Sequence, residues 1–399
     1  MGQTAKAIGT ETAPPAPVPT KRLKPGDFLS EVRTEPDALI HFVLNVGDGD
    51  SQLIVLPADT SGVRRVVVID VATTKKVPAL VEALSDPQDG ILTEPADKRL
   101  FPIVIGTHPH DDHLGGMPEF LDRFHELIGE YWEPGFYHPS GRYVETMRAV
   151  EAGELQHLQP TSGTTRFLGK VKLTALSPGI GLRNRFDTYG TQINDASIAL
   201  RVEYPAARIT QDGENRHYLP IREPWSIILG ADAQTTSWAQ AILDFPRLDR
   251  RSDALARALR SAMGRDLFRG NVFKVPHHAS KHGVNIELVE RIAPQLCLIS
   301  STEGTGRYGF PHRLAVEAIR EALQPLAANR GERKPDFDLG IHYTAALDDG
   351  EPPKRLGSIA VMMPAKRGAR LRLWRFGDSP GAPVELDAAR EMVRPWLSR

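Results

Sequence analysis

Short apolar runs separated by polar turns follow one another along most of this chain, and they predict its strands. Segments 38–57 and 63–72 read as strand, Gly/Asp turn, strand and a third strand, because Val, Ile and aromatic residues are enriched in strands. The run FPIVI within 99–108 has no polar residue, which is typical of a strand covered on both faces. Later strands are expected within 196–205, 224–233, 271–280 and 295–301, and hairpins within 164–178 and 357–376.

Helical spacing of apolar residues occurs between these strands. Amphipathic helices are predicted within 77–86, 117–128, 286–294 and 312–326, and a longer basic stretch between 247 and 274 is also expected to be helical. Two sets of strands, each with helices, predict an α/β fold in which two sheets pack face to face between helical layers. The expected fold is therefore a four-layer αββα sandwich.

The two ends of the chain differ in composition from the middle. Residues 1–25 are rich in Pro, Ala and Thr, so they are expected to form a flexible tail. One large domain is predicted over 26–378, and a C-terminal extension, expected to be helical, over 379–399. The sequence has no secretory signal and no apolar run of about 18 residues that could span a membrane. Its one cysteine, Cys297, excludes an intramolecular disulfide, so a cytoplasmic location is predicted.

The stretch GTHPHDDHLGG, residues 106–116, concentrates metal-binding side chains directly after a buried strand. His108 and His110 lie two residues apart and can point the same way from an extended chain, while Asp112 and His113 enter the next helix and face a second point. A solvated polar loop is the alternative, but this density of histidine and aspartate favours metal binding. Imidazole and carboxylate donors suit Zn²⁺, Mn²⁺ or Fe.

Two other strand ends carry candidate ligands. Asp232 ends the run WSIILGAD, and the pair His277 and His278 ends the strand NVFKV. Alone, a strand-end aspartate is usually a turn or helix cap, and a histidine pair is ambiguous. Together with the first cluster, we expect both to take part in a site for two metal ions.

The pattern H-x-H-x-D-H over residues 108–113 resembles the signature of the metallo-β-lactamase superfamily. The order of further segments is similar to one branch, the ComEC-type hydrolase domain of DNA-uptake competence proteins. The resemblance covers about residues 38 to 325 and implies a metallo-β-lactamase sandwich. The similar segments are 45–55, 67–72, 194–203, 228–233, 275–280 and 306–311.

This resemblance also implies a ligand set for two divalent ions, Zn or Mn. The first metal position would be held by His108, His110 and Asp232. The second would be held by Asp112, His113, Asp232 and one histidine of the pair. His278 is favoured because it directly precedes the small residue Ala279. His277 would then support the site or touch the substrate.

Several residues depart from the superfamily pattern or have a supporting role within it. No histidine lies between His157 and His217, so Asn194 and Ser197 are candidates to fill that side of the first position. Phe310 stands where the branch usually has histidine, and His312, two residues on, is a candidate substitute. Asp70 is expected to be structural or to orient a ligand histidine.

These features predict a hydrolase, because coordination lowers the pKa of water to about 7 and makes metal-bound hydroxide available at neutral pH. The most favoured substrate is a phosphodiester, as for a phosphodiesterase or nuclease. The alternative is a small non-nucleotide substrate such as a lactam, lactone or thioester, to which Phe310 and the net charge of −1 point. A third possibility, a non-catalytic module with the same fold, is disfavoured by the intact ligand set.

Roles can be assigned provisionally within this reaction. Asp112 would position the hydroxide, while His277, His312 or Lys281 would steady charge on phosphate oxygens. Tyr308 would stack on a base or close a loop. The basic residues from Arg247 to Lys274 would follow a nucleic-acid backbone or form a solvated helix face. Nucleic acid or nucleotide is therefore the expected partner, and a membrane is not.

Overall fold

Neighbouring residues of the central strands point alternately into two different cores. In β4 (Val66–Val71), Val66 and Val68 belong to one buried cluster, and Val67 and Ile69 belong to another. Since strand side chains alternate between faces, a strand covered on both sides is apolar throughout. The apolar runs at β2, β3 and β4 therefore become central strands that are buried on both faces.

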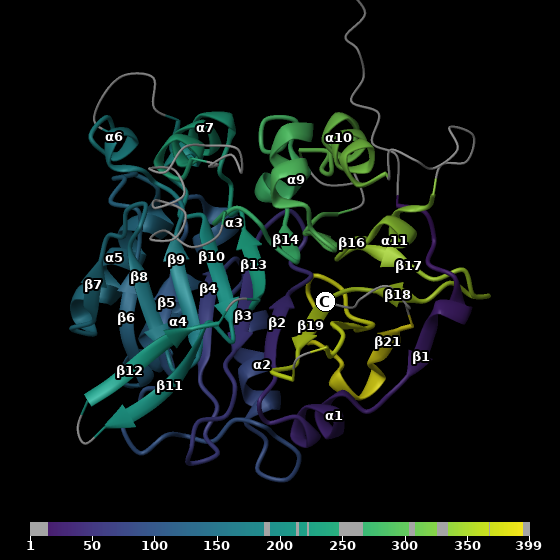
Figure 1. Cartoon of the computed structure of the whole chain (residues 1–399), viewed down its shortest axis with the longest axis horizontal. Helices are drawn as coiled ribbons and strands as arrows, with labels where there is room; N and C mark the ends of the chain where they lie inside the picture. The colour runs from purple at the N-terminus through teal and green to yellow at the C-terminus, as the bar shows by residue number, and fades with distance from the viewer. Residues whose placement is uncertain are drawn as a thin grey trace, which may run out of the picture.

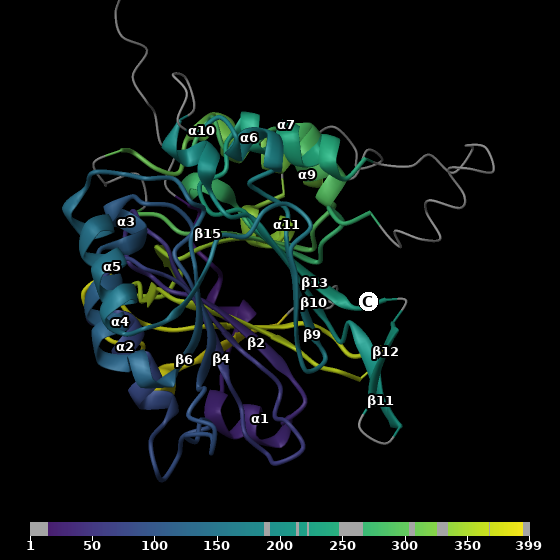
Figure 2. The same ribbon diagram turned by 90° about the vertical axis from the view of Figure 1, so that its left-hand side faces the viewer.

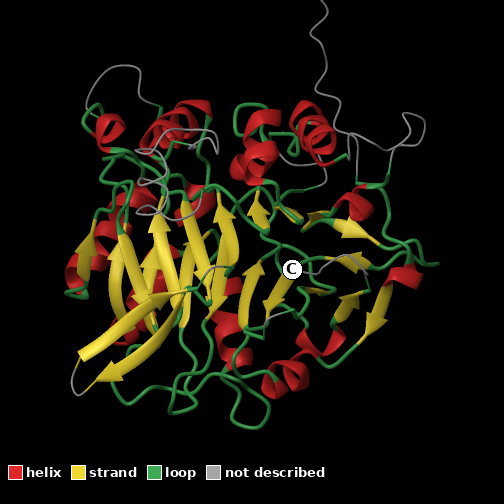
Figure 3. Ribbon diagram, viewed as in Figure 1, coloured by secondary structure: helices red, strands yellow, loops and turns green. Residues whose placement is uncertain are grey.

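The structure is a computed structural model of the chain. It describes residues 15–186, 192–212, 215–221, 223–246, 266–302, 308–324, 334–366 and 368–393. Two large sheets form the middle of the molecule, with helices outside each of them (Figures 1 and 2). Figure 3 shows the same layers by secondary structure. The predicted α/β fold, a four-layer αββα sandwich, is confirmed.

The larger sheet has ten strands in the order β1-β21-β20-β19-β2-β3-β4-β5-β6-β7. The strands from β4 to β7 are parallel and the others antiparallel. Besides β4, its members are β1 (Leu23–Pro25), β2 (Leu39–Val43), β3 (Ser51–Val55), β5 (Phe101–Ile105), β6 (Ile128–Trp132), β7 (Gln156–Leu158), β19 (Ile359–Met363), β20 (Arg372–Arg375) and β21 (Arg390–Met392).

The smaller sheet has seven strands in the order β16-β15-β14-β13-β10-β9-β8, and β13 to β16 are parallel. Its strands are β8 (Thr165–Leu168), β9 (Val171–Ala175), β10 (Leu200–Tyr204), β13 (Trp225–Leu229), β14 (Val272–Lys274), β15 (Leu296–Ile299) and β16 (Ile341–Tyr343). Two separate hairpins are formed by β11 (Ala207–Asp212) with β12 (Asn215–Pro220), and by β17 (Ala346–Leu347) with β18 (Arg355–Leu356).

Helices cover the outer faces of both sheets (Figure 2). On the larger sheet these are α1 (Phe28–Thr34), α2 (Lys76–Leu84), α3 (Asp111–Leu114), α4 (Met117–Phe124) and α5 (Gly141–Ala152). On the smaller sheet they are α6 (Ile180–Arg183), α7 (Thr235–Asp244), α9 (Ile286–Ile292), α10 (Arg313–Leu323) and α11 (Asp336–Leu339). Among the described residues, no helix has both the length and the apolar composition needed to cross a bilayer.

The chain ends differ from the expectation. Residues 1–14 lie outside the described part, but Val18 is buried and β1 pairs antiparallel with β21, Leu23 opposite Met392. Within the expected C-terminal helix, residues 386–388 form a 3-10 turn and Arg390–Met392 a strand. An existing sheet edge supplies hydrogen bonds and an apolar surface for Met392, and this tertiary context overrides weak local preference.

Candidate metal centre

The histidine-rich loop that follows β5 is packed tightly against the end of β4. Gly116 lies so close to Thr73 that a Cβ atom would meet that residue's backbone at 2.4 Å, so a side chain is excluded there. α3 begins at Asp111, which places Asp112 and His113 in its first turn. His108 and His113 are fully buried, whereas the side chain of Asp112 keeps 31% of its exposure. The loop therefore has little freedom to move, and Asp112 faces its open side.

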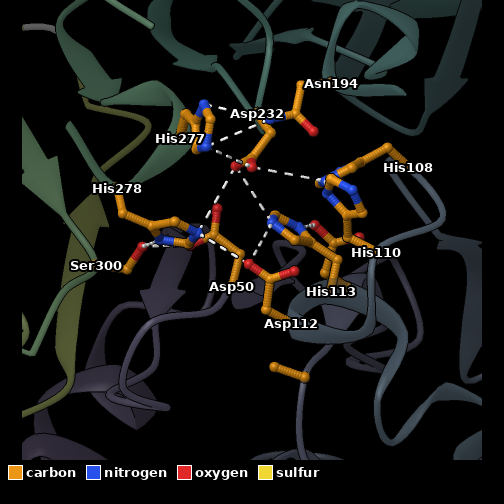
Figure 4. Close-up of polar contacts among 12 residues, drawn as sticks. Asp50, His108, His110, Asp112, His113, Asn194, Asp232, His277, His278 and Ser300 are labelled. Carbon is orange, nitrogen blue, oxygen red and sulfur yellow. Dashed lines mark hydrogen bonds and ion pairs between the residues drawn. The ribbon is translucent and has the colours of Figure 1, made fainter. Parts of the chain in front are cut away.

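The smaller sheet supplies the other candidate ligands, at the ends of adjacent parallel strands. Asp232 follows β13, and His277 and His278 follow β14. His277, His278 and Ala279 all have positive φ angles of 50 to 62°, a conformation that costs non-glycine residues energy and is concentrated at functional sites. Figure 4 shows both histidines and the histidine loop converging on Asp232.

The second position is the point on which Asp112, His113, Asp232 and His278 converge. Oδ1 of Asp232 lies 3.2 Å from His113 Nε2 and 3.7 Å from His278 Nε2. Oδ2 of Asp112 lies 4.0 and 3.6 Å from the same two nitrogens. The structure thus brings together the four residues that the resemblance implied, with His278 and not His277 among them.

The first position is the point between His108, His110 and Asp232. His108 Nε2 lies 3.2 Å from His110 Nδ1 and 3.6 Å from Asp232 Oδ2. The two oxygens of Asp232 therefore face different positions, Oδ2 the first and Oδ1 the second. One carboxylate can in this way bridge two ions.

These donor sets fit metal ions. Ligands about 2.0 to 2.1 Å from a tetrahedral Zn²⁺ lie roughly 3.3 Å from one another, close to the separations in both sets. Three buried atoms at the second position, His113 Nε2, His278 Nε2 and Asp232 Oδ1, also have no hydrogen-bond partner among the residues that the structure describes. A buried polar atom without a partner is costly, and a coordinated ion would satisfy all three. The two clusters therefore indicate a dinuclear site.

Charge is distributed so that the second position favours cations. Burial raises the pKa of Asp232, but attraction from His113, His277 and His108 outweighs it and holds that pKa well below the usual range. Burial lowers the pKa of His113, but Asp232 and Asp70 raise it well above the usual value. The pKa of His278 is likewise raised against burial, by Asp112 and then Asp232. Three carboxylates, Asp70, Asp112 and Asp232, thus hold positive charge at this point.

The histidines of the first position behave in the opposite way. Burial, followed by repulsion from His113, lowers the pKa of His108 well below its usual value. Burial also lowers the pKa of His110. Neutral imidazole is the form that binds metal, so these two side chains are ready to coordinate near neutral pH.

A carboxylate behind His113 fixes its orientation. Asp70, at the end of β4, accepts a hydrogen bond from His113 Nδ1 at 2.7 Å, which leaves Nε2 facing the second position. Asp70 also accepts the backbone N–H and the hydroxyl of Thr107, each at 2.7 Å. It has a positive φ of 58°. The structure therefore places Asp70 behind a ligand histidine, as the sequence analysis expected of it.

His278 has an equivalent support that the sequence did not reveal. Its Nδ1 donates to the hydroxyl of Ser300 at 3.0 Å, and that hydroxyl donates to Asp50. Lys274 Nζ donates to the other oxygen of Asp50 at 2.7 Å, and all four side chains are buried. Asp50 also approaches Asp70 and His113, but its two oxygens are already occupied by Ser300 and Lys274. In the sequence, the only sign of a role for Asp50 is its position in the polar turn GDGDS, residues 47–51.

His277 stands beside the ligands. Its Nε2 lies 3.6 Å from Asp232 Oδ2, and its side chain is partly exposed. Gln234, missed in the sequence analysis, donates an amide N–H to His277 Nδ1 at 3.2 Å, and the Asn194 amide nitrogen lies 3.3 Å from Nε2. Burial lowers the pKa of His277. Asn194 is thus at the centre, held against His277.

The other predicted residues lie farther out or have no contact with the ligands among the described interactions. The backbone N–H of Ile198 donates to Thr107, which places Ser197 next to the histidine loop. Lys281 is exposed, and the pKa of His312 is lowered by burial and then by Lys281 and His282. His312 thus lies on the outer side, although its backbone N–H donates to Ala279.

Residues 247–265, most of the basic stretch from Arg247 to Lys274, lie outside the described part of the chain. Within the described part, Arg269 is exposed. Lys274 is fully buried and bonded to Asp50, so it is not available to a phosphate backbone. The prediction for Lys274 as a surface cation was therefore wrong, because it ends β14 beneath the metal centre.

Comparisons with known proteins concern the fold. No protein-family model matches the sequence, and no curated protein matches it. Solved metallo-β-lactamase fold proteins do match. YhfI from Bacillus subtilis has a TM-score of 0.36 and 9% identity, over 70% of this chain and 93% of that one. A B3 metallo-β-lactamase with an active-site glutamic acid has a TM-score of 0.28 and 14% identity, over 80% of this chain and 100% of its own.

CmlA, a diiron β-hydroxylase from Streptomyces venezuelae, has a TM-score of 0.34 and 11% identity over 72% of this chain. The matched region spans only 50% of CmlA. Similarities of this size say nothing about the chemistry of the site, which depends on the residues of this chain. The similarity to the ComEC-type branch stays a prediction from the sequence motifs.

Proposed function

We propose that this chain is a metal-dependent phosphodiesterase or nuclease whose cofactors are two divalent ions, Zn²⁺ or Mn²⁺. The observation that carries the proposal is the pair of buried donor sets that share Asp232, with the two oxygens of this carboxylate facing different positions. A structural metal site needs no such bridge, whereas hydrolysis by two ions does. The motif order of the ComEC-type branch supports a phosphodiester as substrate.

Two divalent ions held by these donor sets would supply an activated water and would stabilise charge on the attacking and leaving oxygens. Asp112 is the more exposed of the two site carboxylates, so it is accessible to a water on the open side. Burial alone would raise the pKa of Asp112. The hydrogen bond from His278 and the charge of His113 outweigh burial, so the pKa lies below its usual range. A carboxylate of low pKa orients the attacking water by accepting its hydrogen bond.

His277 is the side chain best placed to contact the phosphate. The amide of Gln234 lies 3.2 Å from Nδ1, and Nε2 lies 3.6 Å from Asp232 Oδ2, so the tautomer with its proton on Nε2 would donate a hydrogen bond toward the centre. A donor fixed in advance stabilises charge that develops on a phosphate oxygen in the transition state. Lys281 and His312 lie farther out, so we assign this role to His277.

The test is hydrolysis by protein stripped with EDTA and reloaded with Mn²⁺ or Zn²⁺. Labelled single- and double-stranded DNA, the matching RNAs and bis-p-nitrophenyl phosphate are the substrates, and protein kept in EDTA is the control. Metal-dependent cleavage that disappears in Asp232→Asn, a variant of equal size without the charge, is the expected result.

A different result would redirect the assignment. Two ions bound per chain without cleavage of any phosphodiester would overturn the phosphodiesterase proposal. A panel of lactams, lactones and thioesters would then test the alternative hydrolase. Cleavage that is equal in EDTA and in metal would contradict a metal-dependent reaction.

A further inference from the structure

A row of aromatic rings leads outward from the metal centre. The ring of Phe310 lies 5.6 Å from that of His278 and 5.4 Å from that of His277, centroid to centroid. The ring of Tyr308 lies 5.8 Å from that of Phe310 at an interplanar angle of 27°. The angle between Phe310 and His278 is 31°. Three rings, each inclined by about 30° to the next, therefore connect a buried candidate ligand with the surface.

Exposure increases along this row. His278 is fully buried, Phe310 is partly buried, and Tyr308 is 56% exposed. One face of the Tyr308 ring is covered by Phe310. Aromatic rings prefer offset stacks with centroids 4.5 to 7 Å apart, and both steps of the row fall in this range. Because more than half of the Tyr308 side chain is exposed, a planar group of a ligand can reach its ring.

The chemistry of the row selects what it can bind. Phe310 stands where the ComEC-type branch usually has histidine, and it offers neither a charge nor a hydrogen-bond donor. The aromatic row therefore recognises a ligand by its ring faces and not by contacts to its phosphate. A nucleobase satisfies this requirement, because every base has a flat π-face that stacks on aromatic side chains.

We propose that Tyr308, supported from behind by Phe310, stacks on the nucleobase next to the cleaved phosphate. This inference rests on the proposed phosphodiesterase function and names the part of the substrate that the site holds. Stacking on one ring is tolerant of base identity, so all four bases should be accepted. A substrate without a base at that position should be accepted poorly.

The experiment compares four dinucleotides: thymidylyl-thymidine, the two analogues that lack one base, and the analogue that lacks both. For the wild-type protein, loss of one particular base should lower kcat/KM, mainly through KM, by about 5- to 150-fold. In Tyr308→Ala the ratio of kcat/KM between the full and that abasic substrate should fall toward one. Tyr308→Phe, which keeps the ring, should retain the wild-type ratio.

A purely apolar or structural role would give different results. Tyr308→Leu is apolar but not planar, so a wild-type ratio in this variant would overturn stacking. An equal loss of activity on all four substrates in Tyr308→Ala would also overturn it. Thermal melting of each variant checks that the fold is retained.

Binding separates this inference from the proposed function. Calorimetric titration of thymidine 5′-monophosphate into metal-loaded protein measures the stack without hydrolysis. Weaker binding to Tyr308→Ala than to Tyr308→Phe supports the stack, even if the wild type cleaves no phosphodiester and the phosphodiesterase proposal fails. Equal binding to both variants overturns the stack, even if the phosphodiesterase proposal holds.

Discussion

The two candidate metal positions share Asp232, yet the rest of the molecule supports them differently. The two histidines of the second position come from different sheets, and both have a buried partner behind them. Asp70 accepts from His113, and Ser300, linked to Asp50, accepts from His278. Such partners fix the ring and raise its basicity. The second position is therefore built to keep its ion.

The first position is held by fewer and looser contacts. Its two histidines come from one short stretch, and His110 is partly exposed. His108 Nδ1 contacts the hydroxyl of Thr107 at 3.2 Å, and that hydroxyl donates to Asp70, whereas the described hydrogen bonds place no such support behind His110. We therefore expect the ion at the first position to bind more weakly and to exchange more readily than the ion at the second. The difference shows that two adjacent positions can share a ligand without having equal affinity.

The largest effect should come from Asp232→Ala, because this carboxylate belongs to both positions. Loss of partners that lie behind ligands costs about 10- to 100-fold in affinity, so loss of a shared ligand should cost more than about 100-fold at each position. Metal content by mass spectrometry after gel filtration should fall from two ions to none. Retention of one ion would show that the positions do not share Asp232.

The next effect separates the positions. His278→Ala should empty the second position and leave an ion at the first, with turnover reduced more than about 100-fold since ligand loss exceeds the cost of losing a supporting partner. The matched control is His277→Ala, which should keep both ions and lower kcat. If His277→Ala loses the ion instead, the roles of the two histidines are reversed.

A smaller effect on metal content is expected at the first position. His110→Ala removes one of its two histidines, so its ion should be lost on dialysis while the second position keeps its ion. Titration with Mn²⁺ followed by electron paramagnetic resonance distinguishes a paired from a single ion. Loss of both ions would contradict the independent support of the second position.

Ser300→Ala should have a more modest effect, since it cuts the link between His278 and Asp50 without removing a ligand. Affinity at the second position should fall about 10- to 100-fold. Ser301→Ala is the matched control, because the hydroxyl of Ser301 is buried but has no hydrogen-bond partner among the described residues. Equal metal affinities in the two variants would remove the support that distinguishes the second position.

The smallest effect on the centre is expected from His41, a buried histidine whose Nε2 lies 3.0 Å from Gln52 Oε1. Burial lowers the pKa of His41 to about 4, although the Gln52 hydrogen bond opposes this. An unfolded histidine has a pKa near 6.5, so between pH 6.5 and 4 only the unfolded chain takes up this proton. Stability present above pH 6.5 is therefore lost as the pH falls through this window.

His41→Gln removes that titration and keeps an amide group. The free energy of unfolding at pH 5.5 should lie about 1 kcal/mol closer to its pH 7 value in the variant than in the wild type. Urea unfolding at the two pH values measures this, and the metal content should not change. A parallel pH dependence in both proteins would show that His41 is not kept neutral by burial.

Sequence patterns were most informative where many residues agree. The apolar runs became strands, and the ligands lie where parallel strands end, because loops at that edge of both sheets meet. Asp50, Ser300 and Gln234 were not found, and Lys274 was predicted to be a surface cation, since a single polar residue at a strand end looks like a turn or surface residue. Their partners lie far away in the sequence, so only the folded chain shows the contacts.

The pairing of β1 with β21 also has a consequence for how the protein is made. These strands join residues near opposite ends of the chain, Leu23 beside Met392, at one edge of the larger sheet. Contacts this distant in sequence slow folding, because a long loop must close before they form. During synthesis, β1 leaves the ribosome long before β21 exists. The edges of β1 and β2 that pair with β21 and β19 therefore stay open until residues 359–392 have been made, a period in which chaperone binding would protect them from aggregation.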